Sequence, residues 1–312
     1  MLNPGNKLET ISRALNLRTL LILAPLLLLL PAACSSDSQD PIISSEQEAG
    51  GPAYSGTIIT TDMAVGVNRM LFGVTNRAGM PIIGDSADVG VYFLVPREDA
   101  RELTKEVTAN FISWPTVIGG VFGAEVDIPL GGVYELDIRY TSSDGVEVFA
   151  QTSFLVKDES ETPSVGSPAP ASVTHTLANS EDISHITSSP DPDPDLYQLS
   201  IDEALTQDKP LVIVFATPAF CVSATCGPQV GELTKVKAIV GDRANFIHVE
   251  VFEDPHLIEN HRPTGELVPA VKEWGLPTEP WVFVVDEDGL ISAKFEQFTT
   301  ASEIEAKLLE IL

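Results

Sequence analysis

The sequence predicts two folded segments of different class, an all-β sandwich followed by an α/β domain. Between residues 54 and 156, apolar and polar residues alternate with a period of two, which indicates half-buried strands. After residue 196, helical patterns alternate with short apolar runs of strand length, an order typical of an α/β layer with a mixed sheet. A chain of 312 residues is long enough for one to three domains, each with its own core.

The composition excludes several classes of partner and architecture. The chain carries 45 Asp and Glu against 18 Lys and Arg, for a formal net charge of -27. Nucleic acids and anionic membrane surfaces are bound through Lys and Arg, so we expect neither nucleic acid nor charge-driven membrane docking. Three cysteines are too few for a scaffold built from disulfides, and 44% hydrophobic residues argue against disorder of the whole chain.

Residues 1–33 have the pattern of a secretory signal peptide. A basic start precedes an uncharged apolar run that is shorter than a membrane-spanning helix and is interrupted by prolines. Ala32 and Ala33 stand directly before Cys34, which resembles the bacterial lipoprotein box. That resemblance implies a lipid on Cys34 and a protein anchored in the bacterial cell envelope, facing outside the cytoplasm. The alternative is an ordinary signal peptide with a remaining thiol.

Two segments without periodicity separate the expected folded parts. Residues 34–52 are polar and contain Pro and Gly, which predicts a flexible tether. Residues 158–195 are rich in Pro, Ser and Asp, which predicts a linker of extended character. The β-sandwich is then expected over residues 53–157 and the α/β domain over residues 196–312.

The β-sandwich is expected to contain several short strands. The clearest pattern lies on either side of Asp144-Gly145, a dipeptide that strongly predicts a hairpin turn. Several strands in about 100 residues, without helical periodicity, predict a small sandwich of immunoglobulin-like type. The segment has no cysteine and no cluster of metal ligands, so we interpret it as a spacer or protein-binding module. The expected strands are residues 55–60, 70–75, 87–95, 134–140 and 146–156.

Each element of residues 196–312 has a local signal of its own. Ser200 and Glu203 form a capping box for a short helix, and a second capping box begins at Thr300. Residues 211–215 are a continuous apolar run, typical of a central strand. Pro228 suits the first turn of a helix that extends to about residue 240. We further expect a strand over residues 246–251, a helix over 267–274, a hairpin over 281–285 and 290–295, and a terminal helix after residue 300.

Cys221 and Cys226 lie between the expected central strand and the following helix, where backbone N–H groups and the helix dipole favour a thiolate. This placement, together with the later run Trp274-Gly-Leu-Pro-Thr-Glu-Pro280 and the Asp-x-x-Gly turn that ends at Gly289, resembles the thioredoxin superfamily. The similarity is strongest to its membrane-anchored extracytoplasmic thiol–disulfide oxidoreductases. It covers residues 196–312 and implies a thioredoxin-like domain in that segment.

The resemblance also implies roles for individual residues. Cys221 and Cys226 would be the catalytic pair, and Pro280 would follow a cis peptide bond that faces the cysteine loop. Phe220, Glu279 and Pro280 would contact the substrate. The position after aromatic Phe220 favours Cys221 as the attacking residue, with Cys226 resolving. The alternative register takes Cys226-Gly-Pro as the start of the motif, with Gln229 at the place of the second cysteine.

The sequence departs from the family pattern in two respects. Four residues separate the cysteines, and on a regular helix residues five apart lie roughly 8–9 Å apart at Cα, whereas a disulfide needs about 4.4–6.8 Å. We therefore expect residues 222–225 to form a loop and regular helix to begin near Pro228. In addition, Val214 stands where many family members carry a buried acid, so proton transfer must be arranged differently.

The expected function is thiol–disulfide exchange with exported proteins or a redox partner protein, without cofactor or metal. One alternative is a Cu(I)-binding protein that uses two thiolates and a histidine, because soft thiolates suit Cu(I). His248, His256 and His261 are the candidate histidine ligands, although the pattern around His248 favours a packed or edge position on a strand. The other alternative is a non-catalytic lipoprotein interaction module with a structural disulfide. The direction of electron flow stays open.

Overall fold

The computed structural model describes residues 52–115, 119–259 and 265–312, and these belong to one compact unit. The expected signal peptide, most of the expected tether, and Cys34 and His261 lie outside the described residues. Among the described residues, no helix combines the length and apolar composition that crossing a membrane requires.

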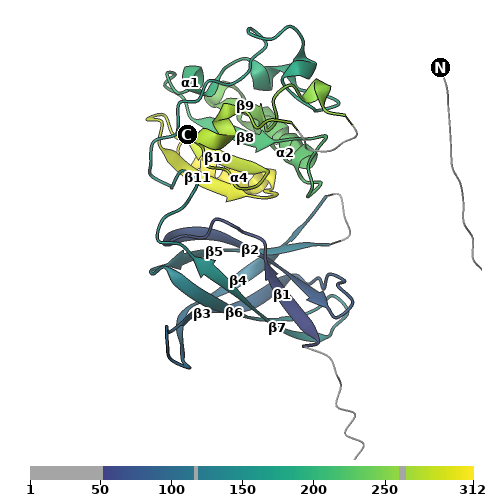
Figure 1. The fold of residues 1–312 in the computed structure, drawn as a ribbon, viewed down its shortest axis with the longest axis vertical. Coiled ribbons are helices and arrows are strands. Elements are labelled where there is room, and N and C mark those ends of the chain that lie inside the picture. The colour runs from purple at the N-terminus through teal and green to yellow at the C-terminus, as the bar shows by residue number, and fades with distance from the viewer. Residues whose placement is uncertain (1–51, 116–118, 260–264) are drawn as a thin grey trace, which may run out of the picture. The chain divides into compact units, whose positions relative to one another are not determined.

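The first part of the described chain forms one antiparallel sheet of seven strands, in the order β1-β2-β5-β4-β3-β6-β7 (Figure 1). The β1–β2 and β6–β7 pairs keep continuous registers, with Tyr54 opposite Asn76 and Gly132 opposite Val156, whereas the β3–β4 register shifts after Val91. The strands are β1 Tyr54–Ile58, β2 Gly66–Asn76, β3 Ser86–Leu94, β4 Arg101–Ser113, β5 Gly120–Ile128, β6 Gly132–Thr141 and β7 Glu147–Val156.

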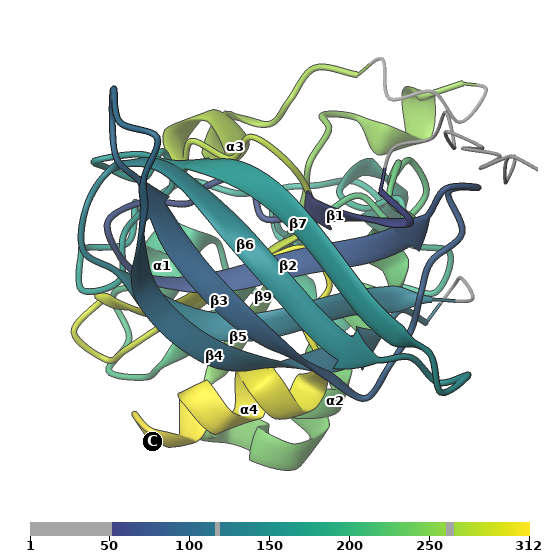
Figure 2. The same cartoon turned by 90° about the horizontal axis from the view of Figure 1, so that it is seen from below.

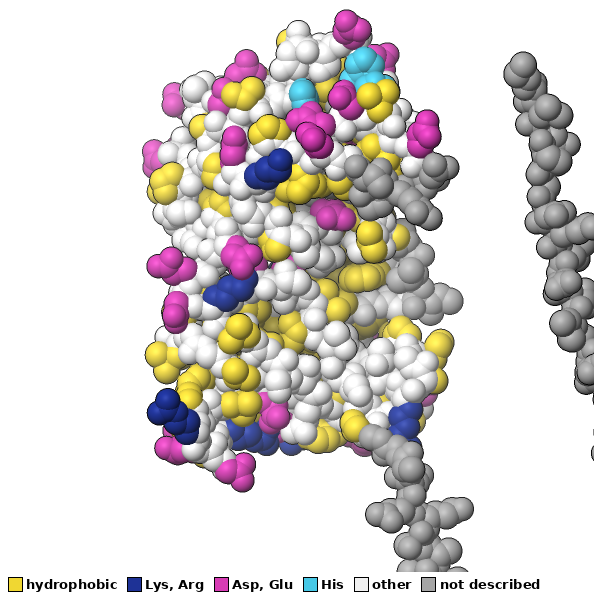
Figure 3. Space-filling model, viewed as in Figure 1, with side chains coloured by type: hydrophobic (Ala, Val, Ile, Leu, Met, Phe, Trp, Pro, Cys, Tyr) yellow, Lys and Arg dark blue, Asp and Glu magenta, His cyan; other side chains and the backbone are white. Residues whose placement is uncertain are grey.

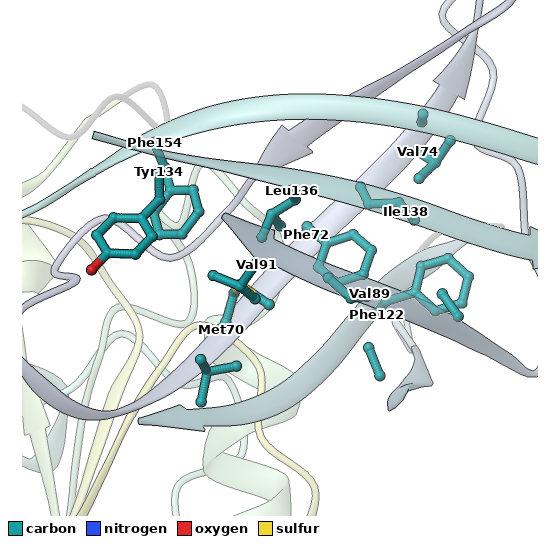
Figure 4. Close-up of a cluster of buried hydrophobic side chains, with 14 of the residues drawn as sticks. Met70, Phe72, Val74, Val89, Val91, Phe122, Tyr134, Leu136, Ile138 and Phe154 are labelled. Carbon is teal, nitrogen blue, oxygen red and sulfur yellow. The ribbon is translucent and has the colours of Figure 1, made fainter. Parts of the chain in front are cut away.

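This sheet curls until its two edge strands meet (Figure 2). A Cβ atom at Gly56 of β1 would lie 3.0 Å from the Ile138 side chain and 3.2 Å from that of Thr152, so glycine permits the close approach of β1 to β6 and β7. The enclosed face carries the core, in which Phe72, Phe122 and Tyr134 are at most 1% exposed (Figure 4). The apolar side chains of this one face therefore bury one another across the curled sheet.

The second part of the described chain forms a four-stranded mixed sheet, in the order β11-β10-β8-β9. Strands β8 and β9 are parallel, and the other neighbours are antiparallel. The strands are β8 Leu211–Ala216, β9 Asn245–Glu250, β10 Trp281–Val285 and β11 Ile291–Glu296. The α-helices are α1 Ile201–Ala204, α2 Cys226–Val240, α3 Pro269–Glu273 and α4 Ala301–Leu309, and short 3-10 turns are η1 Ile183–His185, η2 Pro194–Tyr197, η3 Gly241–Arg243 and η4 Pro255–Leu257.

Both faces of the four-stranded sheet are covered. One face packs with Trp274, Val271 and residues of α1, and the other packs with Leu233 of α2 and Ile304 of α4. Strands β8 and β10 are consequently buried at every position. Because both faces are apolar, these strands read as continuous hydrophobic runs rather than as alternating patterns.

The predicted fold class is wrong. Where an immunoglobulin-like sandwich of two sheets was expected, the structure has one seven-stranded sheet closed upon itself. No separate α/β thioredoxin-like domain is present among the described residues, which are mostly β and form one compact unit. The helices α1 and α3 comprise only four and five residues. Sequence periodicity reports which face of a strand is buried, and this is the same for a sandwich and a closed sheet.

The order of the expected elements after residue 196 is nonetheless found in the structure. Capping boxes open α1 at Ser200 and α4 at Thr300, as their sequences predict. Residues 158–195 are mostly irregular and hydrogen bond to the four-stranded part. The N–H of Gly166 donates to the carbonyl of Ile291 at 2.7 Å, and that of Ala169 to the carbonyl of Gly289 at 2.9 Å.

Polar contacts connect the two sheets. The backbone N–H of Thr61 donates to the Glu296 carboxylate at 2.7 Å. Arg69 of β2 donates to the Glu303 carboxylate at 3.0 Å and to the carbonyl oxygen of Phe298 at 3.1 Å. Asp62 lies close to Lys294 of β11 and accepts hydrogen bonds from Thr162. These contacts hold the start of β2 against the end of β11.

Candidate functional site

The candidate site lies where the ends of three strands meet. Ala216, the last residue of β8, pairs with Glu250, the last residue of the parallel strand β9. Phe215 of β8 pairs with Trp281, the first residue of the antiparallel strand β10. The loops that leave β8 and β9 and the loop that enters β10 therefore converge at one edge. This edge brings together the cysteine loop, Glu250 and the Glu279–Pro280 pair.

Cys221 and Cys226 form a disulfide whose Cα atoms are 5.9 Å apart. The residues between them leave helical geometry, as the spacing predicts, and Ala224 adopts a left-handed φ of 57° within this loop. Helix α2, however, begins at Cys226 and not near Pro228. The expected start was two residues late because Pro228 suits any position in the first turn, where its missing N–H costs no hydrogen bond.

The two sulfur atoms have different surroundings. Cys221 is half-buried, whereas Cys226 is 0% exposed. The backbone N–H of Cys226 donates to the Cys221 sulfur at 3.3 Å, and the Ser223 hydroxyl lies 3.2 Å from the same sulfur. Donors at the start of a helix stabilise negative charge on a sulfur atom. Cys221 therefore has both the solvent access and the hydrogen-bond donors that a thiolate nucleophile needs.

Glu279 lies beside the disulfide, two residues before the start of β10. The Glu279–Pro280 peptide bond is cis, in agreement with the sequence expectation. A carboxylate oxygen of the half-buried Glu279 and the two sulfur atoms all lie within 4.8 Å of one another. Phe220, the third expected substrate contact, is only 8% exposed, and its ring packs edge-on against Phe252. The structure thus places Phe220 in the core beside the site.

Glu250 is a buried carboxyl group that the sequence patterns did not single out. It is 4% exposed and accepts hydrogen bonds from the Ser188 backbone N–H at 2.8 Å, the Ser188 hydroxyl at 2.7 Å and the Val251 N–H at 3.0 Å. Burial raises its pKa above the ordinary carboxyl value despite these bonds. An acidic residue at the end of an apolar strand was the one signal that could have identified it.

The pKa of Glu279 is also raised. Burial is the main cause, and the negative charge of Glu250 adds to it. Glu279 therefore lies next to the disulfide, and Glu250 lies close enough to act on Glu279 through its charge. Among the described residues, no cationic group lowers the pKa of either carboxyl group. Perturbed carboxyl groups beside a reactive side chain are typical of functional sites, although structural networks also produce them.

His248 of β9 is held in a neutral state by its surroundings. Its Nε2 lies 3.1 Å from the Ala216 carbonyl oxygen, which can only accept, so Nε2 carries the proton. Nδ1 then accepts from the Tyr197 hydroxyl at 2.7 Å. Burial lowers the pKa of His248 to about 4. Because both ring nitrogens are engaged, His248 is a packed histidine, as its strand pattern suggests.

Cys221, Cys226 and Glu279 are the one group of metal-binding side-chain types that comes together among the described residues. No histidine of that part of the chain joins this group. His256 instead stacks on His185 with ring centroids 4.0 Å apart. A disulfide offers no thiolate to a metal ion, so we assign no metal to these residues. The Cu(I) alternative lacks its histidine ligand among the residues that the structure describes.

Comparisons with known proteins leave the chain without an assigned family. No protein-family model matches it, and neither does any curated protein. Solved structures that match include superoxide reductase (neelaredoxin) from Ignicoccus hospitalis, at 12% identity and a TM-score of 0.21, covering 33% of this chain and 79% of that chain. A putative superoxide reductase from Thermotoga maritima matches at 8% identity and a TM-score of 0.21, covering 34% of this chain and 86% of that chain. At these TM-scores the similarity carries no information on function.

Proposed function

We propose that the Cys221–Cys226 pair exchanges disulfides with other proteins. The observation that carries this proposal is the asymmetric disulfide at the start of α2, with a half-buried Cys221 and a fully buried Cys226. A partner can reach Cys221, whereas Cys226 is reachable only from within the protein. This asymmetry assigns attack and resolution to different cysteines, which is what a two-step exchange requires.

The exchange proceeds through a mixed disulfide. A substrate thiolate attacks the Cys221 sulfur, a new sulfur–sulfur bond forms, and Cys226 leaves as a thiolate. A second substrate thiolate then attacks the mixed disulfide and releases Cys221, so the substrate loses two electrons and the pair gains two. In the opposite direction, the Cys221 thiolate attacks a substrate disulfide and Cys226 resolves the product. The N–H groups at the start of α2 stabilise Cys221 in its thiolate form.

The partners we propose are exported proteins with thiols or disulfides, met outside the cytoplasm by a protein anchored through lipid on Cys34. The N-terminal sequence pattern supports this setting, since it resembles an export signal followed by a lipoprotein box. Acidic side chains are spread over the face shown in Figure 3, in keeping with the net charge of -27. This charge favours encounters with neutral or basic partners.

The test compares the purified protein with Cys221→Ser and Cys226→Ser, using a small disulfide-bonded peptide and its reduced form as substrates. We expect Cys221→Ser to lose exchange activity by about a thousandfold or more, because no accessible sulfur remains. Cys226→Ser should instead accumulate a mixed disulfide on Cys221, visible by mass spectrometry. Glu287→Gln, an exposed change in the turn before β11, serves as a control that keeps both sulfurs and their hydrogen bonds. Equal rates for the wild type and Cys221→Ser would contradict the proposal.

A further inference from the structure

The buried position of Cys226 raises a problem of proton transfer. In the resolving step, Cys226 must lose its proton to become a nucleophile, yet it is 0% exposed. Burial in apolar surroundings raises the pKa of a thiol and so works against ionisation. Val214 stands where many thioredoxin-like proteins carry a buried acid, but its side chain is 0% exposed and cannot accept a proton. The base must therefore come from another element.

Glu279 is the carboxyl group in reach. Its carboxylate oxygen lies within 4.8 Å of both sulfur atoms, a separation that one bridging water or a small rotation of the side chain can span. Glu279 is half-buried, so it borders both the buried Cys226 and the solvent. We propose that Glu279 accepts the proton of Cys226 in the resolving step and returns a proton when Cys226 is released as a thiolate. This inference rests on the proposed disulfide exchange.

Burial and the charge of Glu250 set the proton affinity of Glu279 among the described residues. Cys221 and Cys226 lie beside it, and Glu250 acts on it through its negative charge. Glu250 is kept in place by the Ser188 hydroxyl and the Ser188 and Val251 backbone N–H groups. Burial and this neighbouring charge raise the pKa of Glu279 towards that of a thiol. A smaller difference in proton affinity between base and thiol makes the transfer more favourable.

The step is balanced in atoms and electrons. It starts from a mixed disulfide between Cys221 and the substrate, with Cys226 as a thiol and Glu279 as a carboxylate. The Cys226 proton passes to Glu279, and the sulfur electron pair attacks the Cys221 sulfur. The bond between Cys221 and the substrate sulfur breaks, and the substrate leaves as a thiolate. That thiolate takes up the proton from Glu279, so no further oxidant or reductant is needed.

The test follows the resolving step directly. Reduced protein is mixed with 5,5′-dithiobis(2-nitrobenzoate), so that attack by Cys221 and resolution by Cys226 each release one coloured thiolate. In Glu279→Gln we expect the second phase to slow by about a hundredfold near neutral pH, with the first phase changed less than about threefold. Plotted against pH, the wild-type rate of the second phase should have an inflection at a pH above the ordinary carboxyl pKa. The rate of Glu279→Gln should lack this inflection. Glu287→Gln, an exposed change in the turn before β11, is the matched control.

Glu250→Gln provides a second, independent variant that keeps Glu279. Removing the charge of Glu250 should lower the proton affinity of Glu279 and move the inflection of the second phase to lower pH. A wild-type second phase in Glu279→Gln at every pH would overturn the inference, as would an unchanged inflection in Glu250→Gln. These results are distinct from failure of the proposed function, which would appear as exchange that survives Cys221→Ser.

Discussion

The two sheets use buried carboxyl groups in opposite ways. In the seven-stranded sheet, Asp137 is 1% exposed and accepts hydrogen bonds from Arg101 and Gln151. Burial alone would raise its pKa, but these partners lower it below the ordinary value. At the edge of the four-stranded sheet, no cationic partner among the described residues lowers the pKa of Glu250 or Glu279, and both values are raised. A paired buried carboxylate is explained by structure, whereas an unpaired one beside a disulfide calls for a functional explanation.

The strands of the two sheets also differ in how they are buried. Strand β7 alternates between buried and exposed positions along most of its length, so it has one face in the core and one in solvent. Strands β8 and β10 are buried on both faces, so side chains that can reach a partner lie beyond the strand ends. The disulfide, Glu250 and Glu279 all lie at the ends of strands β8, β9 and β10 or in the loops that follow or precede them.

The largest expected effect concerns the core of the seven-stranded sheet. Phe122 is 1% exposed, and its ring centroid lies 5.5 Å from that of Phe72 and 4.8 Å from that of Tyr140. We expect Phe122→Ala to lower the free energy of unfolding by about 3–5 kcal/mol, measured by chemical denaturation. Leu155→Ala, at a side chain that is 62% exposed, should change it by less than about 0.5 kcal/mol.

Phe122→Ala also separates the two regions functionally. Because the core of the seven-stranded sheet contains no reacting group, disulfide exchange per folded molecule should match that of the wild type. A specific loss of exchange in folded Phe122→Ala protein would show that the two regions are coupled.

The next effect is the acid dependence that His248 confers. Its folded-state pKa of about 4 lies below the ordinary value of 6.5, so the unfolded state binds the proton more readily between these two pH values. Stability from this residue is thus complete above pH 6.5 and is lost as pH falls to about 4, by about 3 kcal/mol. His248→Asn should remove this share of the slope in denaturation curves measured from pH 4 to 7. An identical slope in both proteins would contradict the assignment.

Asp62 is expected to make a smaller contribution to the free energy of unfolding, through a buried carboxylate that has hydrogen-bond partners. Burial raises the pKa of its carboxyl group, but hydrogen bonds from Ser160, Glu161 and Thr162 outweigh burial and hold the pKa well below the ordinary value. Its stabilising contribution is therefore present above the ordinary carboxyl pKa and is lost only as pH falls through the lowered value. Asp62→Asn should lower the free energy of unfolding by about 2 kcal/mol at pH 7, with the difference shrinking in strong acid. A difference that stays constant with pH would exclude the charge as its cause.

The smallest effect on stability is expected next to the disulfide. Val222 is 84% exposed, so Val222→Ser should change the free energy of unfolding by less than about 0.5 kcal/mol. The same change removes the exposed apolar side chain that follows Cys221 and should slow exchange with apolar peptide substrates by about threefold. Peptides with polar flanking residues serve as the comparison. Equal slowing of both substrate types would show that the substitution changes the cysteine loop itself and not an apolar contact between Val222 and the substrate.

Sequence patterns predicted the local elements better than the architecture. The Asp144-Gly145 turn joins β6 to β7, with Gly145 at a φ of 79° as a tight hairpin turn requires. By contrast, β4 was not expected, because its residues are mostly exposed and do not alternate. Closure of the sheet depends on contacts between β1 and β7, about 90 residues apart in the chain, and no local pattern encodes such a contact.

The sequence predicted the cysteines of the candidate site but not the roles of its two carboxyl groups. The position of Cys221 and Cys226 between a strand and the start of a helix followed from local signals, and so did the loop between them. Glu250 escaped notice because its importance comes from the register that places it opposite Ala216. Glu279 was expected as a substrate contact, and its closeness to both sulfurs appears only when the start of β10 is placed beside the end of β8.

The most direct test of the account is a redox titration of the Cys221–Cys226 pair in the folded protein. The protein is equilibrated with reduced and oxidised glutathione in varied ratio, free thiols are alkylated, and each cysteine is read by mass spectrometry. We expect a reversible transition of the pair, with faster alkylation at Cys221 than at Cys226. A disulfide that stays intact at every ratio, or that reacts only after the protein unfolds, would contradict disulfide exchange at this site.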